Sequence, residues 1–319
     1  MSDMTTTAAT AGTGGAGARA EARGIRSTRG TRATGGSGTG GSGIRAGGNR
    51  PGMLRVGVSR IGHETKGYFR SPDAVFFTFL FPLVMLGIFT AAFSASGDIV
   101  PGPGMEGVSV GAYYLPGMLA AGMLLSGVQN LAVDIATEKG DGTLKRLGGT
   151  PLSPVSYFLG KIGQVFVTAV LQAALLLLAA GTLFGIALPT TSEAWLTFSW
   201  VFVLGVATSA LCGIALSAVP RSGKSATAVV IPIVLVLQFI SGVYLQFSQL
   251  PEWMQNIASV FPLKWMAQGM RAVFLPDDFK VLEQHGEWDL GWVAVALLAW
   301  LVIGLVVSRL TFRWIRRDA

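Results

Sequence analysis

Six long apolar runs constrain the fold of this chain more than any other feature of its sequence. Each run has about the 20 residues that a helix needs to cross the hydrocarbon core of a bilayer. Only 13% of all residues are charged, whereas soluble domains carry about 25%. We therefore predict an all-α polytopic membrane protein with six transmembrane helices. The predicted spans lie near residues 75–93, 113–133, 162–188, 195–219, 226–247 and 290–307.

The basic residues orient these predicted spans, because cytoplasmic loops carry an excess of Lys and Arg. With both termini in the cytoplasm, the inner segments hold 21 of the 24 basic residues, and the outer ones hold only Lys264, Arg271 and Lys280. We therefore predict that both termini are cytoplasmic. This topology also accounts for the net charge of +7, so we expect no nucleic-acid partner.

The chain outside the spans divides into three segments. Residues 1–50 are mostly Gly, Ala, Thr, Ser and Arg, which cannot bury enough apolar surface to offset chain entropy, so we expect a disordered cytoplasmic tail. Residues 51–74 mix basic and apolar side chains, as is typical of an interfacial helix. A transmembrane domain over 75–312 is followed by a basic cytoplasmic tail over 313–319.

Two polar segments between spans have helical patterns of their own. Residues 134–161 form a longer connection than a turn requires, and leucines alternate there with charged side chains, which predicts a short amphipathic helix that rests on a partner. Residues 249–274 predict two short amphipathic helices in the outer interface, because Pro251 suits a first helical turn and Pro262 interrupts the pattern. Trp253 and Trp265 would be their interfacial anchors.

Several kinds of active site are excluded by missing residues. Residues 221–225 resemble the end of a phosphate-binding loop, but Ala218 replaces its first glycine and no soluble strand precedes it, so we expect no nucleotide to bind. The two histidines, His63 and His285, lie on opposite sides of the predicted membrane, so we expect no metal site. Serines in the spans lack a histidine or lysine to act as base, which argues against an enzyme.

The polar residues within the spans are uncharged, apart from Asp134 at one end of the second span. They could form hydrogen bonds between helices, worth about 1 kcal/mol or less each, or they could form a weakly polar lining for an amphipathic substrate. A carrier driven by protons or sodium needs titratable groups in its spans, so the energy for transport must come from elsewhere. The candidate lining residues are Gln129, Asn130, Gln172 and Gln238.

A series of short motifs follows in order from residue 54 to the C-terminus. They are R-S-P at 70–72, Y-L-P-G at 114–117, E-K-G-D-G-T-L-K-R-L at 138–147, T-P-L-S at 150–153, L-G-K at 159–161, S-G-V at 241–243, L-P-E-W at 250–253 and F-P-L at 261–263. Together they resemble the permease subunits of ABC-2 type exporters, especially the daunorubicin-resistance-like branch. Gly140, Lys145 and the pair Gly148-Gly149 depart from the residues usual there.

The resemblance implies a membrane subunit that exports an amphipathic compound, such as a drug, an antibiotic or a lipid-linked molecule, from the bacterial cytoplasmic membrane. It implies a dimer, either of identical chains or with a sister permease, and two separate ATPase subunits that use ATP and Mg. This chain itself would bind no cofactor and catalyse no reaction. An alternative is an ATP-independent channel or carrier that is regulated through its inner loop.

The same resemblance makes the region 138–153 a coupling helix, on which the ATPase docks, and the interfacial helix at 51–74 a connecting helix against the same subunit. It makes Pro251, Trp253, Pro262 and Trp265 part of an outer re-entrant segment. Thr150 and Pro151 would end the coupling helix. The implied contact residues before them are Glu138, Gly142, Thr143, Leu144, Lys145, Arg146 and Leu147.

Overall fold

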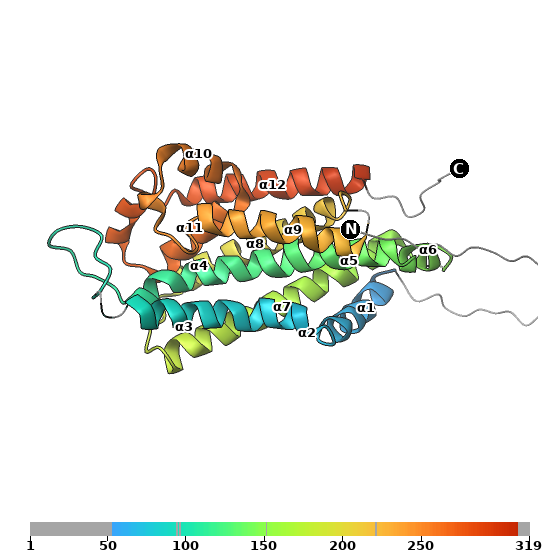
Figure 1. The fold of residues 1–319 in the computed structure, drawn as a ribbon, viewed down its shortest axis with the longest axis horizontal. Coiled ribbons are helices and arrows are strands. Elements are labelled where there is room, and N and C mark those ends of the chain that lie inside the picture. Colours follow the sequence, from blue (N-terminus) through green and yellow to red (C-terminus); the bar gives the residue numbers. More distant parts are fainter. Residues whose placement is uncertain (1–52, 94, 96, 151, 221, 312–319) are drawn as a thin grey trace, which may run out of the picture. The chain divides into compact units, whose positions relative to one another are not determined.

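A computed structural model describes residues 53–311, except for positions 94, 96, 151 and 221 (Figure 1). The predicted tails at 1–50 and 313–319, and Pro151, lie outside the described residues. Within the described part the secondary structure is helical, apart from one isolated antiparallel bridge between Ile99 and Val108.

Six helices in the described part are long and apolar enough to cross a membrane, as predicted. Two of them contain a π-helical segment between two α-helical segments. The first consists of α2 (Pro72–Val75), η1 (Phe76–Leu80) and α3 (Phe81–Phe93), and the second of α4 (Val110–Leu124), η3 (Leu125–Asn130) and α5 (Leu131–Gly140). The other four are α7 (Pro154–Thr182), α8 (Ser192–Leu216), α9 (Gly223–Ile240) and α12 (Leu290–Thr311).

Local sequence explains two of the differences between the predicted and the observed bounds of the spans. The third span begins at Pro154 instead of 162, because the Ser153 side chain accepts a hydrogen bond from Ser156 N–H and Pro154 fits the first turn. The fifth span ends at Ile240 instead of 247, because Gly242 has a φ of +76°, a left-handed conformation that suits glycine. The earlier start of the third span places Lys161 and the residues just before it inside α7, and not in the connection that precedes the helix.

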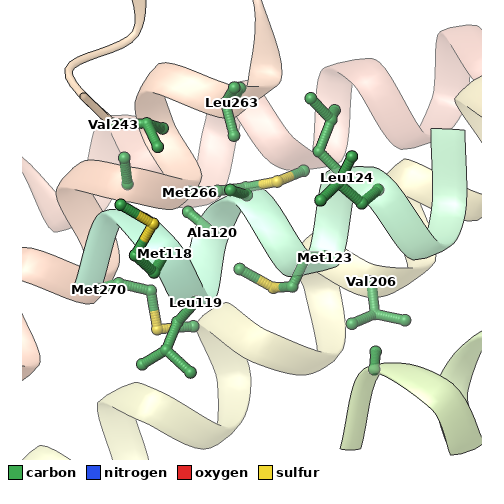
Figure 2. Packing of buried hydrophobic residues seen from close by; sticks show 14 of the residues in the cluster. Met118, Leu119, Ala120, Met123, Leu124, Val206, Val243, Leu263, Met266 and Met270 are labelled. Atoms are coloured by element: carbon green, nitrogen blue, oxygen red, sulfur yellow. The ribbon is translucent and has the colours of Figure 1, made fainter. Parts of the chain in front are cut away.

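The segment α4 lies at the centre of the packing. In the span Val110–Gly140, 83% of the most apolar window is buried, against 17% to 50% in the other five spans. Methionines from α4 and from α11 (Pro262–Phe274) meet there, as Figure 2 shows for Met118, Met123, Met266 and Met270. Small residues permit the close approach of neighbouring helices, and a Cβ at Gly122 would overlap the Gln172 side chain of α7.

Figure 1 shows short helices at both ends of the spans. At one end, α1 (Met53–Tyr68) and α6 (Thr143–Gly148) lie near the start of α7. The α1 helix packs closely on α7, since a Cβ at Gly160 would approach the Arg60 side chain to 2.8 Å. We call this end the α6 end. The opposite end carries α10 (Glu252–Val260), and we call it the α10 end.

The segment 249–274 forms two short helices that are divided at Pro262, as predicted. The prediction that both tryptophans lie at a surface is wrong for one of them. Trp253 is 61% exposed, but Trp265 is 7% exposed and donates a hydrogen bond to the Ser259 carbonyl oxygen. The reason is that α11 packs among α4, α8 and α12, so its apolar face is covered by protein.

Candidate functional site

The predicted coupling helix over 138–153 is not continuous in the structure. The helix α5 ends at Gly140, and the short helix α6 begins at Thr143. The break occurs because Gly142 adopts a φ of +79° and because Asp141 Oδ1 accepts a hydrogen bond of 2.8 Å from Thr143 N–H. The hydrogen bonds from Thr143 hold the pKa of the Asp141 carboxyl below its ordinary value.

The predicted contact residues of this region fall into two groups. Lys145, Arg146 and Thr150 are exposed and therefore accessible to a partner. Leu144 is buried, with 6% exposed, and so anchors α6 to the rest of the chain. Gly142, Thr143 and Leu147 are half-buried.

A buried lysine of the L-G-K motif, to which the sequence analysis assigned no role of its own, connects three helices at the α6 end. Lys161 of α7 is 1% exposed, and its Nζ lies 2.8 Å from Glu64 Oε2 of α1 and 2.7 Å from Glu138 Oε1 of α5. It also forms an ion pair with Asp134 of α5. We call Lys161 and these three carboxylates the Lys161 network.

Two further side chains extend the Lys161 network. The Tyr157 hydroxyl donates a 2.6 Å hydrogen bond to Glu138 Oε2, and Arg60 Nε donates a 2.9 Å hydrogen bond to Glu64 Oε1. Glu138, which the sequence predicted to contact an ATPase, therefore points to Tyr157 and Lys161. The i, i+4 spacing of Asp134 and Glu138, and the lysine directly before the third predicted span, were the sequence signals for this network.

The three carboxylates of the Lys161 network resemble a metal site in their spacing, since one oxygen from each lies within 4.8 Å of the others. The Lys161 ammonium already lies at hydrogen-bond distance from the carboxylates. It supplies the positive charge that such a cluster requires. The arrangement therefore is that of a shared ion pair rather than a set of metal ligands.

A cavity of about 720 Å³ lies beside the Lys161 network, between α1, α2, η1, η3, α5, α6, α7 and α9. Of the four amides proposed as cavity lining, Gln129 and Asn130 line it. Asn130 Nδ2 donates a 2.6 Å hydrogen bond to Thr78 Oγ1. Tyr68 also lines the cavity, and burial raises the pKa of its hydroxyl to about 12, so this group stays neutral.

The other two amides lie outside this cavity. Gln172 is fully buried beside Gly122, and its side-chain amide has no hydrogen-bond partner in the described part of the chain. Gln238 Oε1 accepts a hydrogen bond from the Tyr244 hydroxyl. Both amides therefore belong to the packing between helices.

Two basic residues toward the α10 end are buried, although they were predicted in outer segments. Arg271 pairs with Glu283, and its Nη1 donates a 3.1 Å hydrogen bond to the Gly242 carbonyl oxygen. Lys264 is fully buried, and its Nζ lies 3.7 Å from the centroid of the Trp265 ring, with no hydrogen-bond partner among the described residues. Burial lowers the pKa of Lys264 to about 8.

The six long apolar helices indicate a multi-pass membrane protein. Residues 103–310, which are more than half of the chain, match the family described as ABC-2 family transporter protein. The chain belongs to this family, which confirms the family-level resemblance drawn from its motifs. It is a membrane permease of the ABC-2 type, a component that is generally not catalytic itself. No curated protein matches the chain significantly.

Proposed function

We propose that this chain is the membrane-spanning subunit of an ATP-driven exporter in a bacterial cytoplasmic membrane. In this proposal the α6 end faces the cytoplasm, and two separate ATPase subunits dock on α6 of a permease dimer. The ATPases use ATP and Mg, and the permease moves an amphipathic compound outward, as in the daunorubicin-resistance-like branch that its motifs resemble. The proposal rests on one observation: α5, which α6 follows after a short turn, is connected to α1 and α7 through the Lys161 network.

The exposed side of α6 carries positive charges that could bind an ATPase subunit. Lys145 and Arg146 are exposed, while Leu144 is buried, so the helix presents two cations and is held by an apolar anchor. An ATPase surface with acidic side chains would complement these cations. The paired charges would also determine how α6 aligns on that surface. Lys145 replaces the residue usual in the resembling family, so this positive charge is a particular feature of the chain.

The Lys161 network supports the transmission of a displacement from α6. Helix α6 follows α5 after a turn at Asp141 and Gly142, and α5 carries Asp134 and Glu138. A shift of α5 must therefore either move α7 and α1 with it or separate buried charges. Separation of buried charges is unfavourable, so the helices would move together and change the adjoining cavity.

A co-purification experiment tests the docking. The chain would be expressed with the soluble ATPase encoded by a neighbouring reading frame. Reversal of both exposed charges (Lys145→Glu with Arg146→Glu) is expected to reduce the recovered ATPase at least tenfold, about 1.4 kcal/mol, and to stop ATP-dependent export. Lys280→Glu at the α10 end is the control and should retain both.

The choice of variant matters, because Leu144→Asp would place a charge at a buried position and would damage α6 itself. Full recovery of the ATPase with the double reversal would refute docking on this face. Transport that continues after ATP depletion would instead favour the ATP-independent channel or carrier. Both experiments therefore separate the exporter from its alternative.

A further inference from the structure

The cavity at the α6 end has an excess of negative charge. Its lining includes four carboxylates and the single formal cation Arg60. Lys161 is not part of the lining but is shared by three of these carboxylates, and Arg60 pairs with Glu64. Two cations thus compensate four acids, which are Glu64, Asp73, Asp134 and Glu138.

Two of these acids are placed to receive a positively charged group. Asp73 is exposed and makes no ion pair within the described residues. The Asp134 side chain is 50% exposed, although one of its oxygens contacts Lys161. The two acids lie on different helices, one near the start of the first span and one in α5. A ligand cation in the cavity would therefore be attracted by carboxylates from two different helices.

The cavity also has an apolar part. Phe77 is 41% exposed and lines the cavity together with Tyr68, Val133 and Ile231. Aromatic and aliphatic side chains beside a few polar groups are typical of sites for organic ligands, and a volume of about 720 Å³ falls within their usual range of about 300–1,000 Å³. Aromatic faces also attract organic cations.

Two side-chain amides in the lining lack partners. Gln129 is 8% exposed and Gln164 is 5% exposed, and neither amide makes a hydrogen bond to any described residue. Their remaining donors and acceptors are therefore available to polar atoms of a bound molecule. The two amides are polar groups of the lining that lie apart from the acids.

Both π-helical segments of the structure as described border this cavity. Phe77 belongs to η1 and Gln129 to η3, and the hydrogen bond from Asn130 to Thr78 joins the two segments. Such π-helical turns are rare and are found frequently at functional sites. Their coincidence here supports a binding role for the cavity rather than a packing defect.

From these observations we propose that the cavity binds amphipathic organic cations, in which a single positive group is carried on an apolar body. The positive group would lie between Asp73 and Asp134, the apolar body against Phe77 and Tyr68, and polar substituents near Gln129 and Gln164. An organic anion of the same shape would face the uncompensated carboxylates and be excluded. This inference rests on the proposed export function, because it names the class of cargo.

The test uses two probe ions of nearly the same shape and opposite charge, tetraphenylphosphonium and tetraphenylborate. The full chain would be placed in nanodiscs of zwitterionic lipid, without ATPase or ATP, and binding would be measured relative to empty nanodiscs. The chain is expected to bind tetraphenylphosphonium above that background and not to bind tetraphenylborate. Binding of both ions with equal affinity would overturn the charge argument.

Matched variants locate the binding. Asp73→Asn and Asp134→Asn are each expected to weaken tetraphenylphosphonium binding about tenfold, since each removes one attracting charge. Asp73→Asn is the decisive variant because it leaves the Lys161 network intact. Glu106→Gln, in the exposed segment between the first two spans, is the control and should leave binding unchanged.

The outcomes separate this inference from the proposed export function. Unchanged binding in Asp73→Asn, or an equal loss in Glu106→Gln, would refute the cation site and would leave ATPase docking to be judged by the charge reversal on α6. Cation binding that requires Asp73, in a chain that recovers no ATPase, would support the site and count against the ATP-driven exporter.

Discussion

Replacement of Lys161 by methionine is expected to destabilise the protein strongly. Methionine is nearly the same length but carries no charge, so Lys161→Met would leave the carboxylates of Glu64 and Glu138, 10% and 17% exposed, without their shared cation. Removing one partner of a buried ion pair costs about 3–5 kcal/mol. The half-exposed Asp134 adds little, because water screens its charge.

Thermal unfolding in detergent, followed by fluorescence-detected size exclusion, measures this loss. A change of 1 kcal/mol shifts the melting temperature of a domain of about 150–250 residues by about 2–4 °C, so Lys161→Met in this chain is expected to lower it by several degrees, up to about 20 °C. Lys145→Met, the same substitution at an exposed position of α6, is the control and should shift it by less than about 2 °C.

A second substitution tests whether the loss arises from uncompensated charge. In Lys161→Met with Glu138→Gln, one buried carboxylate is neutral, so the double variant should be more stable than Lys161→Met alone. Such non-additivity is the sign of a direct interaction. A melting temperature of Lys161→Met within about 2 °C of the wild type, or strictly additive effects of the two substitutions, would refute the reasoning.

Two further predictions concern other parts of the chain. Because burial lowers the pKa of Lys264 to about 8 in the folded state, the unfolded chain holds more protons between pH 8 and about 10.4, and stability should rise with pH across this window. Lys264→Met should abolish that rise in melting scans and stabilise the protein by up to about 3 kcal/mol at pH 7. A Cβ at Gly213 would overlap the Gly127 carbonyl oxygen, so Gly213→Ala should cost about 1–3 kcal/mol. Gly62→Ala, where a Cβ meets nothing within 4 Å, should be neutral or slightly stabilising in the same scans.

The sequence was sufficient for the six spans because length and apolar composition alone decide whether a helix can cross a bilayer. It was also sufficient for the break at Pro262, where a proline fits a first turn and interrupts the helix before it. These features depend on local chemistry. The family could be inferred for a similar reason, since its motifs are short and lie in a fixed order.

Features that depend on tertiary packing were not predictable in the same way. Trp265 has the composition of an interfacial anchor, but α4, α8 and α12 cover its helix. Gln129 and Gln172 are equivalent as uncharged span residues, yet one lines the cavity and the other packs beside Gly122. Lys161 connects three helices only because α1, which carries Glu64 and is distant along the chain, packs against α7.

The two proposed roles of the α6 end share residues and are therefore coupled. Asp134 and Glu138 belong to the Lys161 network and also line the cavity, and Thr143 and Leu147 of α6 line it as well. A cation bound near Asp134 would compete with Lys161 for that carboxylate and would weaken the connection between α5 and α7. Because coupling between two binding events is reciprocal, ATPase bound to α6 must change cation affinity by the same factor as the cation changes ATPase affinity. Equal tetraphenylphosphonium affinities with and without the docked ATPase would show that the shared residues do not couple the two sites.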